Sequence, residues 1–196
     1  MLTQLITIKS RLGITITDYD DLLTSAIKAI SNRFDKECNR TLARSTGTTE
    51  EFSPDQTEVP VSCFPIESVT KFELKSNETD GWSEQTNVQF LLRRNCVISI
   101  LSPLSPLLSS TSPALARVTY SGGYVLPGDA PSPGQTALPD DLEQAAVEQV
   151  AYWFRTRDLT GLIRSWPHDG TYQAFLQSDL LLEVRAVLKK YERLVF

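Results

Sequence analysis

The chain has 196 residues, of which 41 % are hydrophobic and 22 % are charged, and its formal net charge is −5. These values are ordinary for a globular protein that is long enough to bury a core. The acidic balance argues against a dedicated nucleic-acid-binding protein, because such proteins usually carry a basic excess. No stretch approaches the roughly 18 apolar residues of a membrane span, and the N-terminus lacks signal-peptide features. We therefore expect no membrane partner.

Three cysteines, Cys38, Cys63 and Cys96, are scattered along the chain and are odd in number. Such a set does not make a disulfide framework. We expect all three to be reduced and mostly buried, in a chain that folds in the cytoplasm.

Residues 1–44 predict two helices. Leu5, Ile8 and Leu12 share one helical face, and Gly13 is placed to end that helix in the left-handed conformation. The sequence Thr17-Asp18-Tyr19-Asp20 fits a capping box at the start of a longer helix. Apolar residues recur in this second helix at spacings of three and four, which predicts one buried stripe: Leu23, Ile27, Ile30, Phe34 and Cys38.

Residues 45–126 predict a β region. Ser, Thr, Pro and Glu dominate residues 45–60, so we expect a loop with one edge strand there. Apolar alternation predicts a strand around residues 69–74, and residues 88–92 and 96–101 predict a β-hairpin with Asn95 in its turn. Residues 102–113 are rich in Ser and Pro and indicate an exposed excursion. A further strand is predicted at residues 116–120.

Residues 127–196 predict a Pro- and Gly-rich loop followed by two helices. The first opens at Leu138-Pro139-Asp140, where Pro139 suits the first turn. Its apolar face predicts deep burial: Leu142, Ala146, Val150 and Trp153. The last helix is expected from about residue 178, with a heptad-like seam: Leu181, Val184, Leu188, Tyr191 and Val195.

Together these elements predict an α+β fold. We expect mainly a helical bundle of about four helices, with an antiparallel β region inserted between the second and third helices. The whole chain, 1–196, is then one domain, made of the N-terminal helices (1–44), the β insertion (45–126) and the C-terminal helices (127–196).

The sequence offers little for catalysis or metal binding. His168 is the only histidine, so general-base chemistry on Ser121 or Cys63 would have to pass through it, and no spacing predicts such contact. One His and three separated Cys give no zinc pattern. Asp18, Asp20 and Asp21 lack the Gly and Glu of a calcium loop and are better explained as helix-capping acids. We expect no enzyme activity and no cofactor.

Two features could contact a partner. Arg155, Arg157 and Arg164 form a loose basic cluster that could meet phosphate or a partner's carboxylates, although solvated helix-end cations explain it as well. The apolar residues Leu194, Val195 and Phe196 either fold onto their own domain or anchor in another protein.

Several short motifs follow one another in a characteristic order along the chain. They are Ile8-Lys9, Leu12-Gly13-Ile14, Asp20-Asp21-Leu22-Leu23, Cys38-Asn39-Arg40, Phe64-Pro65-Ile66-Glu67-Ser68-Val69, Val118-Thr119-Tyr120-Ser121-Gly122-Gly123-Tyr124 and Leu138-Pro139-Asp140-Asp141-Leu142. In this order they resemble the tailed-phage head–tail connector (adaptor) proteins. The resemblance covers most of the chain and leaves residues 102–114 and the Trp166 region unmatched.

The resemblance implies a structural virion protein of the neck, between capsid and tail. Such proteins add to the portal protein after DNA packaging and form a homo-oligomeric ring of about twelve copies, in which one face of a subunit meets a different face of the next. The ring continues the DNA channel toward a tail stopper or tail terminator protein, and double-stranded DNA passes without specific binding. The C-terminal segment commonly docks on the portal, which points to Leu194, Val195 and Phe196. The alternatives are a tail-side stopper or tail completion protein of the same neck, and a hydrolase that uses His168.

Overall fold

A computed structural model describes residues 1–77, 79, 81–101, 115–157 and 179–193. The chain divides into two compact units, each made of separate segments. The first, here called the helical unit, comprises Met1–Phe34 and Pro139–Tyr191. The second, here called the β unit, comprises Asp35–Leu138 and Glu192–Phe196. The two units are described separately below.

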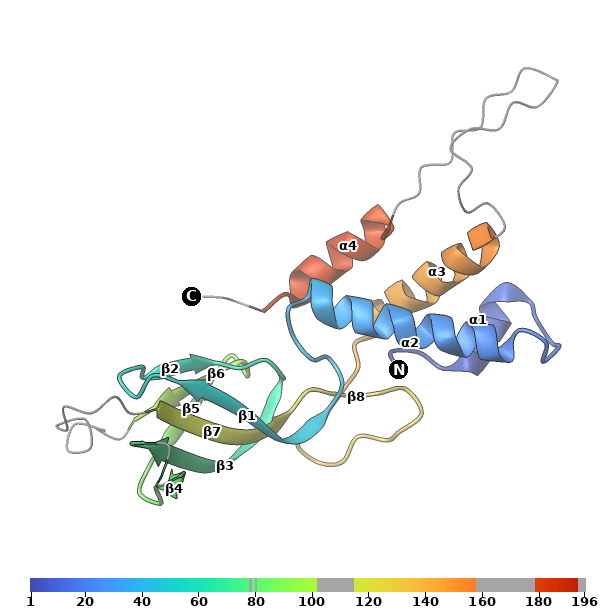
Figure 1. The fold of residues 1–196 in the computed structure, drawn as a ribbon. Coiled ribbons are helices and arrows are strands. Elements are labelled where there is room, and N and C mark those ends of the chain that lie inside the picture. Colours follow the sequence, from blue (N-terminus) through green and yellow to red (C-terminus); the bar gives the residue numbers. More distant parts are fainter. Residues whose placement is uncertain (78, 80, 102–114, 158–178, 194–196) are drawn as a thin grey trace, which may run out of the picture. The chain divides into compact units, whose positions relative to one another are not determined.

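The helical unit is built around α3, which packs against α1 and against α4 (Figure 1). The helices are α1 (Leu5–Leu12), α2 (Asp20–Glu37), α3 (Asp140–Thr156) and α4 (Leu182–Leu188), and a short 3-10 helix, η2 (Lys189–Tyr191), follows α4. Apolar side chains from all four α-helices are buried at the spacings that the sequence predicts. They include Ile8, Leu23, Ile27, Ile30, Phe34, Leu142, Ala146, Val150, Val184 and Leu188. None of the described helices is long and apolar enough to cross a membrane.

The ends of the first helices follow local chemistry. Gly13 ends α1 with φ +69°, and its N–H points to the carbonyl oxygens of Lys9 and Ser10. The prediction of this helix and of its glycine terminus is confirmed. Asp20, at the start of α2, accepts a hydrogen bond from the Lys9 ammonium group at 2.7 Å, which joins the end of α1 to the next helix.

A buried glutamine fixes the approach to α4. Gln149 lies on α3 and is completely buried, where an unpaired amide would be costly. Its Oε1 accepts a hydrogen bond from the backbone N–H of Leu181 at 3.0 Å, and its Nε2 lies 3.5 Å from the carbonyl oxygen of Asp179. The last helix therefore begins at Leu182, later than expected, and gives way to η2 after Leu188, so it is shorter than the predicted seam.

The β unit contains three sheets of described strands. An antiparallel sheet has the order β1-β7-β3-β4, a second antiparallel sheet has the order β2-β6-β5, and β8 pairs with β9 in parallel. The strands are β1 (Ser45–Phe52), β2 (Glu58–Pro60), β3 (Ile66–Lys75), β4 (Ser83–Glu84), β5 (Phe90–Arg93), β6 (Val97–Ile100), β7 (Leu115–Gly122), β8 (Tyr124–Val125) and β9 (Thr136–Ala137). Figure 1 shows β1, β7 and β3 side by side.

The two larger sheets share one apolar core. All four residues of β6 are buried, as expected of a strand between two others with both faces covered. The core includes Phe52, Val59, Val61, Cys63, Ile66, Phe72, Ile98, Ile100, Ala116, Val118 and Tyr120. Phe72 also packs against the rings of Phe52 and Phe90, with centroids 6.1 and 6.2 Å apart. The β unit is therefore a two-sheet structure with a core of its own.

The prediction of a mainly helical bundle is wrong. Of the described residues, 34 % are helical and 29 % lie in strands, so the β region is a body of comparable weight and not a minor insertion. The edge strand expected within residues 45–60 is present as β1, at the edge of the first sheet, but a second strand, β2, follows at residues 58–60, where the sequence predicted loop. Residues 45–52 form β1 along the whole of their length, because threonines suit the pleated backbone and β7 provides a long partner.

The β-hairpin is confirmed. β5 and β6 pair in antiparallel fashion, and Arg94 and Asn95 take positive φ values of 50° and 53° in the turn between them. The sequence had singled out Asn95 for this conformation. The predicted strands around residues 69–74 and 116–120 are also present, and both extend further than the apolar pattern indicated.

Several predicted features lie outside the described residues. They are the Ser/Pro-rich excursion at 102–113, the Trp166 turn with His168, Arg164, and the apolar residues Leu194, Val195 and Phe196.

Candidate functional site

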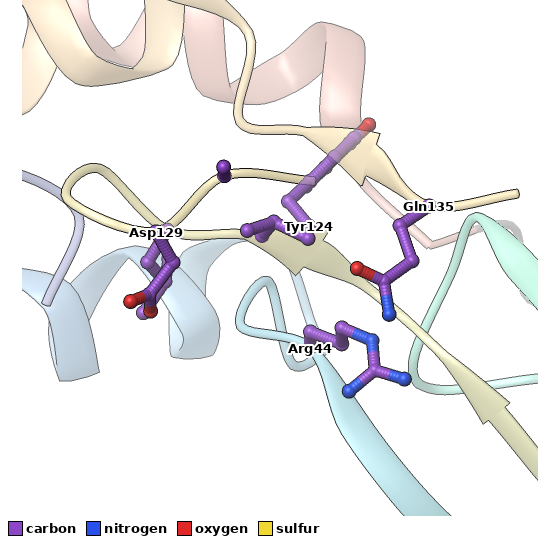
Figure 2. Close-up of a pocket in the computed structure, with 7 residues that line it drawn as sticks. Arg44, Tyr124, Asp129 and Gln135 are labelled. Atoms are coloured by element: carbon purple, nitrogen blue, oxygen red, sulfur yellow. The ribbon is translucent and has the colours of Figure 1, made fainter. Parts of the chain in front are cut away.

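A polar pocket of about 270 Å³ opens in the β unit (Figure 2). Its walls come from β8, from the loop that follows β8, and from Arg44 just before β1. Figure 2 shows the Arg44 guanidinium and the Gln135 amide on one side of the pocket and the Asp129 carboxylate on the other. The pocket is lined by Arg44, Tyr124, Val125, Leu126, Asp129, Ala130 and Gln135.

The charge of Arg44 is already compensated. Its Nε and Nη2 donate to the two carboxylate oxygens of Glu67 at 2.8 and 3.0 Å, and these hydrogen bonds raise the pKa of Arg44. Gln135 Oε1 accepts a hydrogen bond from the backbone N–H of Ser132, which braces the loop. Asp129 is exposed and contributes a carboxylate to the pocket. Among its lining residues the pocket holds no nucleophile beside a base.

The turn between β7 and β8 positions Tyr124 at this pocket. A Cβ on Gly122 would lie 2.6 Å from the Cys63 carbonyl oxygen and 2.8 Å from that of Pro65, so only glycine fits. Gly123 takes a φ of +96° and makes the turn. The sequence favoured a tight turn over a phosphate cradle here, and carbonyl oxygens pressed against Gly122 fit a turn, because they would repel a phosphate.

Arg40 is a buried cation beside the same tyrosine. The residue is only 4 % exposed, and its guanidinium carbon lies 3.2 Å from the ring centroid of Phe64 and 5.3 Å from that of Tyr124. Its three side-chain nitrogens meet no described acceptor with hydrogen-bond geometry. Burial lowers the pKa of Arg40, and the neighbouring Tyr124 side chain opposes this shift most strongly. The stacking of the guanidinium on the Phe64 ring is a further favourable contact.

The Cys63 thiol, which the sequence offered as a nucleophile, is buried, and so is Cys38. The Sγ of Cys63 donates to the carbonyl oxygens of Gly122 and Ala43 at 3.2 and 3.5 Å, and burial raises its pKa. Burial also raises the pKa of Cys38 to about 11. A thiol is reactive as its thiolate, so both residues are poor nucleophiles. Ser121 lies within β7, and the structure does not test contact with His168, which is outside the described residues.

No metal centre is visible in the described part of the chain. Among those residues, no group of three or more His, Cys, Asp or Glu side chains is placed to hold an ion. Asp20, one of the three acids considered for calcium, is instead paired with Lys9.

The two described arginines of the predicted cluster, Arg155 and Arg157, lie in different environments. Arg157 ends α3, donates to the carbonyl oxygen of Phe154 at 2.6 Å, and lies over the rings of Phe154 and Tyr19. Part of its role is thus to pack the end of the helix. Arg155 lies in the last turn of α3 and is exposed. Arg164 lies outside the described residues, so the structure does not test whether the three act together.

Both units expose large apolar side chains. Leu182 is 80 % exposed and Ile6 is 69 % exposed in the helical unit, while Leu101 and Leu91 are 55 % and 47 % exposed in the β unit. Single exposed apolar residues are common on protein surfaces. Adjacent ones such as Leu91 and Leu92, at the edge of a sheet, are more typical of a surface that another chain covers.

Sequence reasoning missed the residues that organise these sites. Arg40 and Gln149 are among the most buried polar side chains described. The spacing of apolar residues in the sequence does not distinguish such buried polar residues from polar residues on the surface. Tyr124 was noticed only as part of a turn. The available signal for Arg40 was its place directly after an apolar helical stripe, which was too weak to use.

Comparison with known proteins gives a family. A model of the family described as "Head completion protein" matches residues 2–194. No curated protein matches the sequence significantly. Two similar solved structures come from gene transfer agent (GTA) particles, one from the neck of the empty particle computed with C6 symmetry and one from the virion of the native particle.

The first of these structures is 13 % identical to this chain with a TM-score of 0.55, and the second is 16 % identical with a TM-score of 0.57. Each alignment covers 98 % of this chain and 90 % of the other. At these identities the likeness establishes a shared fold over nearly the whole chain. Because the family model spans almost every residue, the chain belongs to the head completion protein family, a family of structural proteins.

Proposed function

We propose that this protein is a structural component of the virion neck, where a homo-oligomeric ring of it joins the portal to the tail and continues the DNA channel. The observation that carries the proposal is the family match over residues 2–194. The shared fold supports it, because one similar chain was determined in the neck of a particle computed with C6 symmetry.

The surface chemistry is compatible with a ring. A cyclic ring needs two different surfaces on each subunit, since every contact is heterologous. Exposed apolar side chains occur on both units, with Ile6 and Leu182 on one and Leu91, Leu92 and Leu101 on the other. Each set gives a surface that association would remove from water.

The ring is tested by the mass of the purified protein, alone and with the portal protein of the same virus. Native mass spectrometry should show a closed oligomer of about twelve copies, at least when portal is present. Leu91→Glu should weaken the oligomer, because it would bury a charge at a subunit contact. Thr119→Ala, on a central strand, is the matched control. A chain that stays monomeric with portal would contradict the ring.

Portal docking is proposed for Leu194, Val195 and Phe196. Moving an apolar segment from water into an interface lowers the free energy of the complex. Serine at all three positions should therefore weaken portal binding by at least about tenfold. Leu182→Ser is the control, because it removes one exposed leucine elsewhere. Normal portal affinity of the triple-serine variant would refute this docking. Binding to a tail-side protein in place of the portal would instead favour a stopper.

Arg155 and Arg157 are proposed as secondary contacts to a partner's carboxylates or phosphates. Arg155 is the better candidate, because Arg157 already packs on two aromatic rings. Arg155→Ala should lower affinity for a partner without changing stability, and its effect should shrink as salt is raised.

A further inference from the structure

The edge strand β5 exposes apolar side chains on both of its faces. It ends the sheet β2-β6-β5, so among the described strands it has β6 on one side and no strand on the other. Phe90 packs against the ring of Phe72 in the core, and successive side chains of a strand point to opposite faces. Leu91 therefore lies on the outer face and Leu92 on the core face, and both are exposed.

Leu101 extends the apolar surface on the outer face. Its N–H donates to the carbonyl oxygen of Gln89 at 2.9 Å, so the β5–β6 ladder continues to this residue. Ile100 belongs to the core, so Leu101 lies on the other face of the ladder, the face of Leu91. Sheet edges that stay unpaired usually carry charges, proline or a bulge. The first three residues of β5 carry none of these, which favours pairing with another strand.

Among the described strands, β1 is the edge best suited to receive β5. β4, β8 and β9 have two residues each, and β2 contains Pro60, which has no N–H for a ladder. β1 ends the sheet β1-β7-β3-β4 and pairs with β7 in continuous register from Thr48 to Phe52. Because β1 and β5 belong to different sheets, they give one subunit the two different surfaces that a ring requires.

The charges beside these two edges are opposite. Arg93 and Arg94 follow the leucines of β5 and are exposed, and Glu51 is exposed on β1. Arg93 already pairs with Glu58 of its own subunit, so Arg94 is the better placed cation for a neighbour. A parallel pairing of β5 with β1 brings the C-terminal ends of both strands together, and with them Arg94 and Glu51.

We propose that β5 of one copy pairs in parallel with β1 of the next copy, so that the sheet continues from subunit to subunit, with Arg94 facing Glu51 across the contact. This inference rests on the proposed ring and names the surfaces that form it. Backbone hydrogen bonds and the removal of the exposed leucines from water supply the affinity. The charge pair sets the direction of the pairing.

Hydrogen exchange of the full chain tests the pairing of the backbones. The β5 and β1 amides that point away from β6 and β7 are free in a single copy and hydrogen-bonded in the ring. Their exchange should therefore slow by at least about tenfold when the ring assembles. The amides of β7, which lies between β1 and β3 in every state, are the internal reference. Unchanged exchange at β5 and β1 in the ring overturns the pairing, and so does slow exchange at β5 in the unassembled chain.

Charge reversal tests the identity of the partner strand. Arg94→Glu and Glu51→Arg should each weaken association between copies by at least about tenfold, measured by native mass spectrometry over a dilution series. The double variant restores the pair with opposite polarity and should recover most of the association; no recovery overturns the contact between these two residues. Lys28→Glu makes the same charge change on the exposed side of α2 and should associate like the parent.

A further substitution separates association from folding. Arg94 has a φ of 50°, which asparagine adopts more easily than arginine in such a turn. Arg94→Asn removes the charge and should weaken association, while the melting temperature of the unassembled chain does not fall. Association equal to that of the parent would count against the charge pair.

The outcomes separate this inference from the ring on which it rests. A parent chain that stays monomeric with portal refutes the ring, and the pairing with it. A ring that assembles normally with Arg94→Glu and with Glu51→Arg leaves the ring standing and overturns the pairing. Protection of β5 that appears only when portal joins an already formed ring assigns this edge to the portal and also overturns the pairing between copies.

Discussion

Single buried polar side chains hold segments that are distant in the sequence in place by hydrogen bonds to the backbone. Gln149 is the clearest case, because it satisfies the backbone at both Asp179 and Leu181 from inside the helical unit. A hydrogen bond of this kind contributes little net stability, because the same groups bond to water in the unfolded chain. Removing one partner costs more, because the other group then stays in the folded protein without a hydrogen bond.

Gln149→Leu is expected to destabilise the protein by about 1–3 kcal/mol, because the N–H of the half-buried Leu181 and the Asp179 carbonyl oxygen would both lose this partner. Urea unfolding followed by circular dichroism measures this loss. Gln144→Leu provides the control on the same helix, since Gln144 is exposed and pairs only with Glu148; its effect should stay within about 0.5 kcal/mol. Equal effects of the two substitutions would contradict the role given to Gln149.

The Cys38 thiol makes stability depend on alkaline pH. Burial raises its pKa from 9.0 to about 11, so the folded protein keeps a proton that the unfolded chain releases first. This contribution to stability is complete below pH 9 and is lost as pH rises toward 11. The urea midpoint should therefore fall over that window, and Cys38→Ala should reduce the fall. Cys63 adds to the same trend. A pH-independent midpoint would refute the assignment.

At the scale of elements, β7 is the strand on which the β unit depends. It lies between β1 and β3, and its end, at Gly122, passes so close to the Cys63 and Pro65 carbonyls that no side chain fits. Nearby, Tyr120 on the same strand accepts the backbone N–H of Cys63 through its hydroxyl at 3.0 Å. The segment 62–66 is thus held against β7 by both a close approach and a hydrogen bond.

Gly122→Ala should destabilise the protein by about 1–3 kcal/mol, because the added methyl group meets backbone on two sides and neither atom is the end of a flexible side chain. Thermal and urea unfolding give the size of the effect. Thr119→Ala, on the same strand, should change stability by less than about 0.5 kcal/mol. If the alanine at position 122 is tolerated as well as the one at 119, the close approach described here does not limit the fold.

The elements also show what a sequence can and cannot predict. The stripe of α2 and the β5–β6 hairpin follow from local spacing and turn chemistry and are confirmed. The predicted faces of α1 and α3 are present but less deeply buried than expected, because Leu5, Leu12 and Trp153 are only half-buried. An edge strand was expected within residues 45–60 and is present as β1, but its length was not predicted, because a polar, Thr-rich segment becomes a strand only where a distant partner such as β7 is available. The site residues Arg40 and Gln149 were missed for a similar reason, since their partners Phe64 and Leu181 are remote in sequence.

For the whole molecule, two units are built from interleaved segments. The chain passes between them after Phe34, after Leu138 and after Tyr191. On the β-unit side each passage is fixed locally: Arg40 lies under Phe64, the Leu138 N–H bonds to the Val125 carbonyl oxygen, and Arg193 bonds to Pro60.

The net charge bears on the proposed channel. A protein that holds DNA releases counterions from phosphates by means of Lys and Arg, and its affinity then falls steeply with salt. This chain carries 19 Lys and Arg against 24 Asp and Glu, so a ring of it is acidic overall. We expect a conduit through which DNA passes without being retained, which is what ejection requires.

The assembled ring should therefore bind linear duplex DNA more weakly than about 0.1 mM at 0.15 M salt, the weak end of nonspecific binding. Fluorescence anisotropy of a labelled duplex, titrated with the ring at several salt concentrations, measures this. Arg155→Glu should leave the signal unchanged, because no phosphate contact is lost. Micromolar binding with a steep salt dependence would contradict the conduit. If Arg155→Glu then reduced that slope, Arg155 would belong to a DNA-holding surface, and the contacts proposed for it would be with phosphate and not with a partner protein.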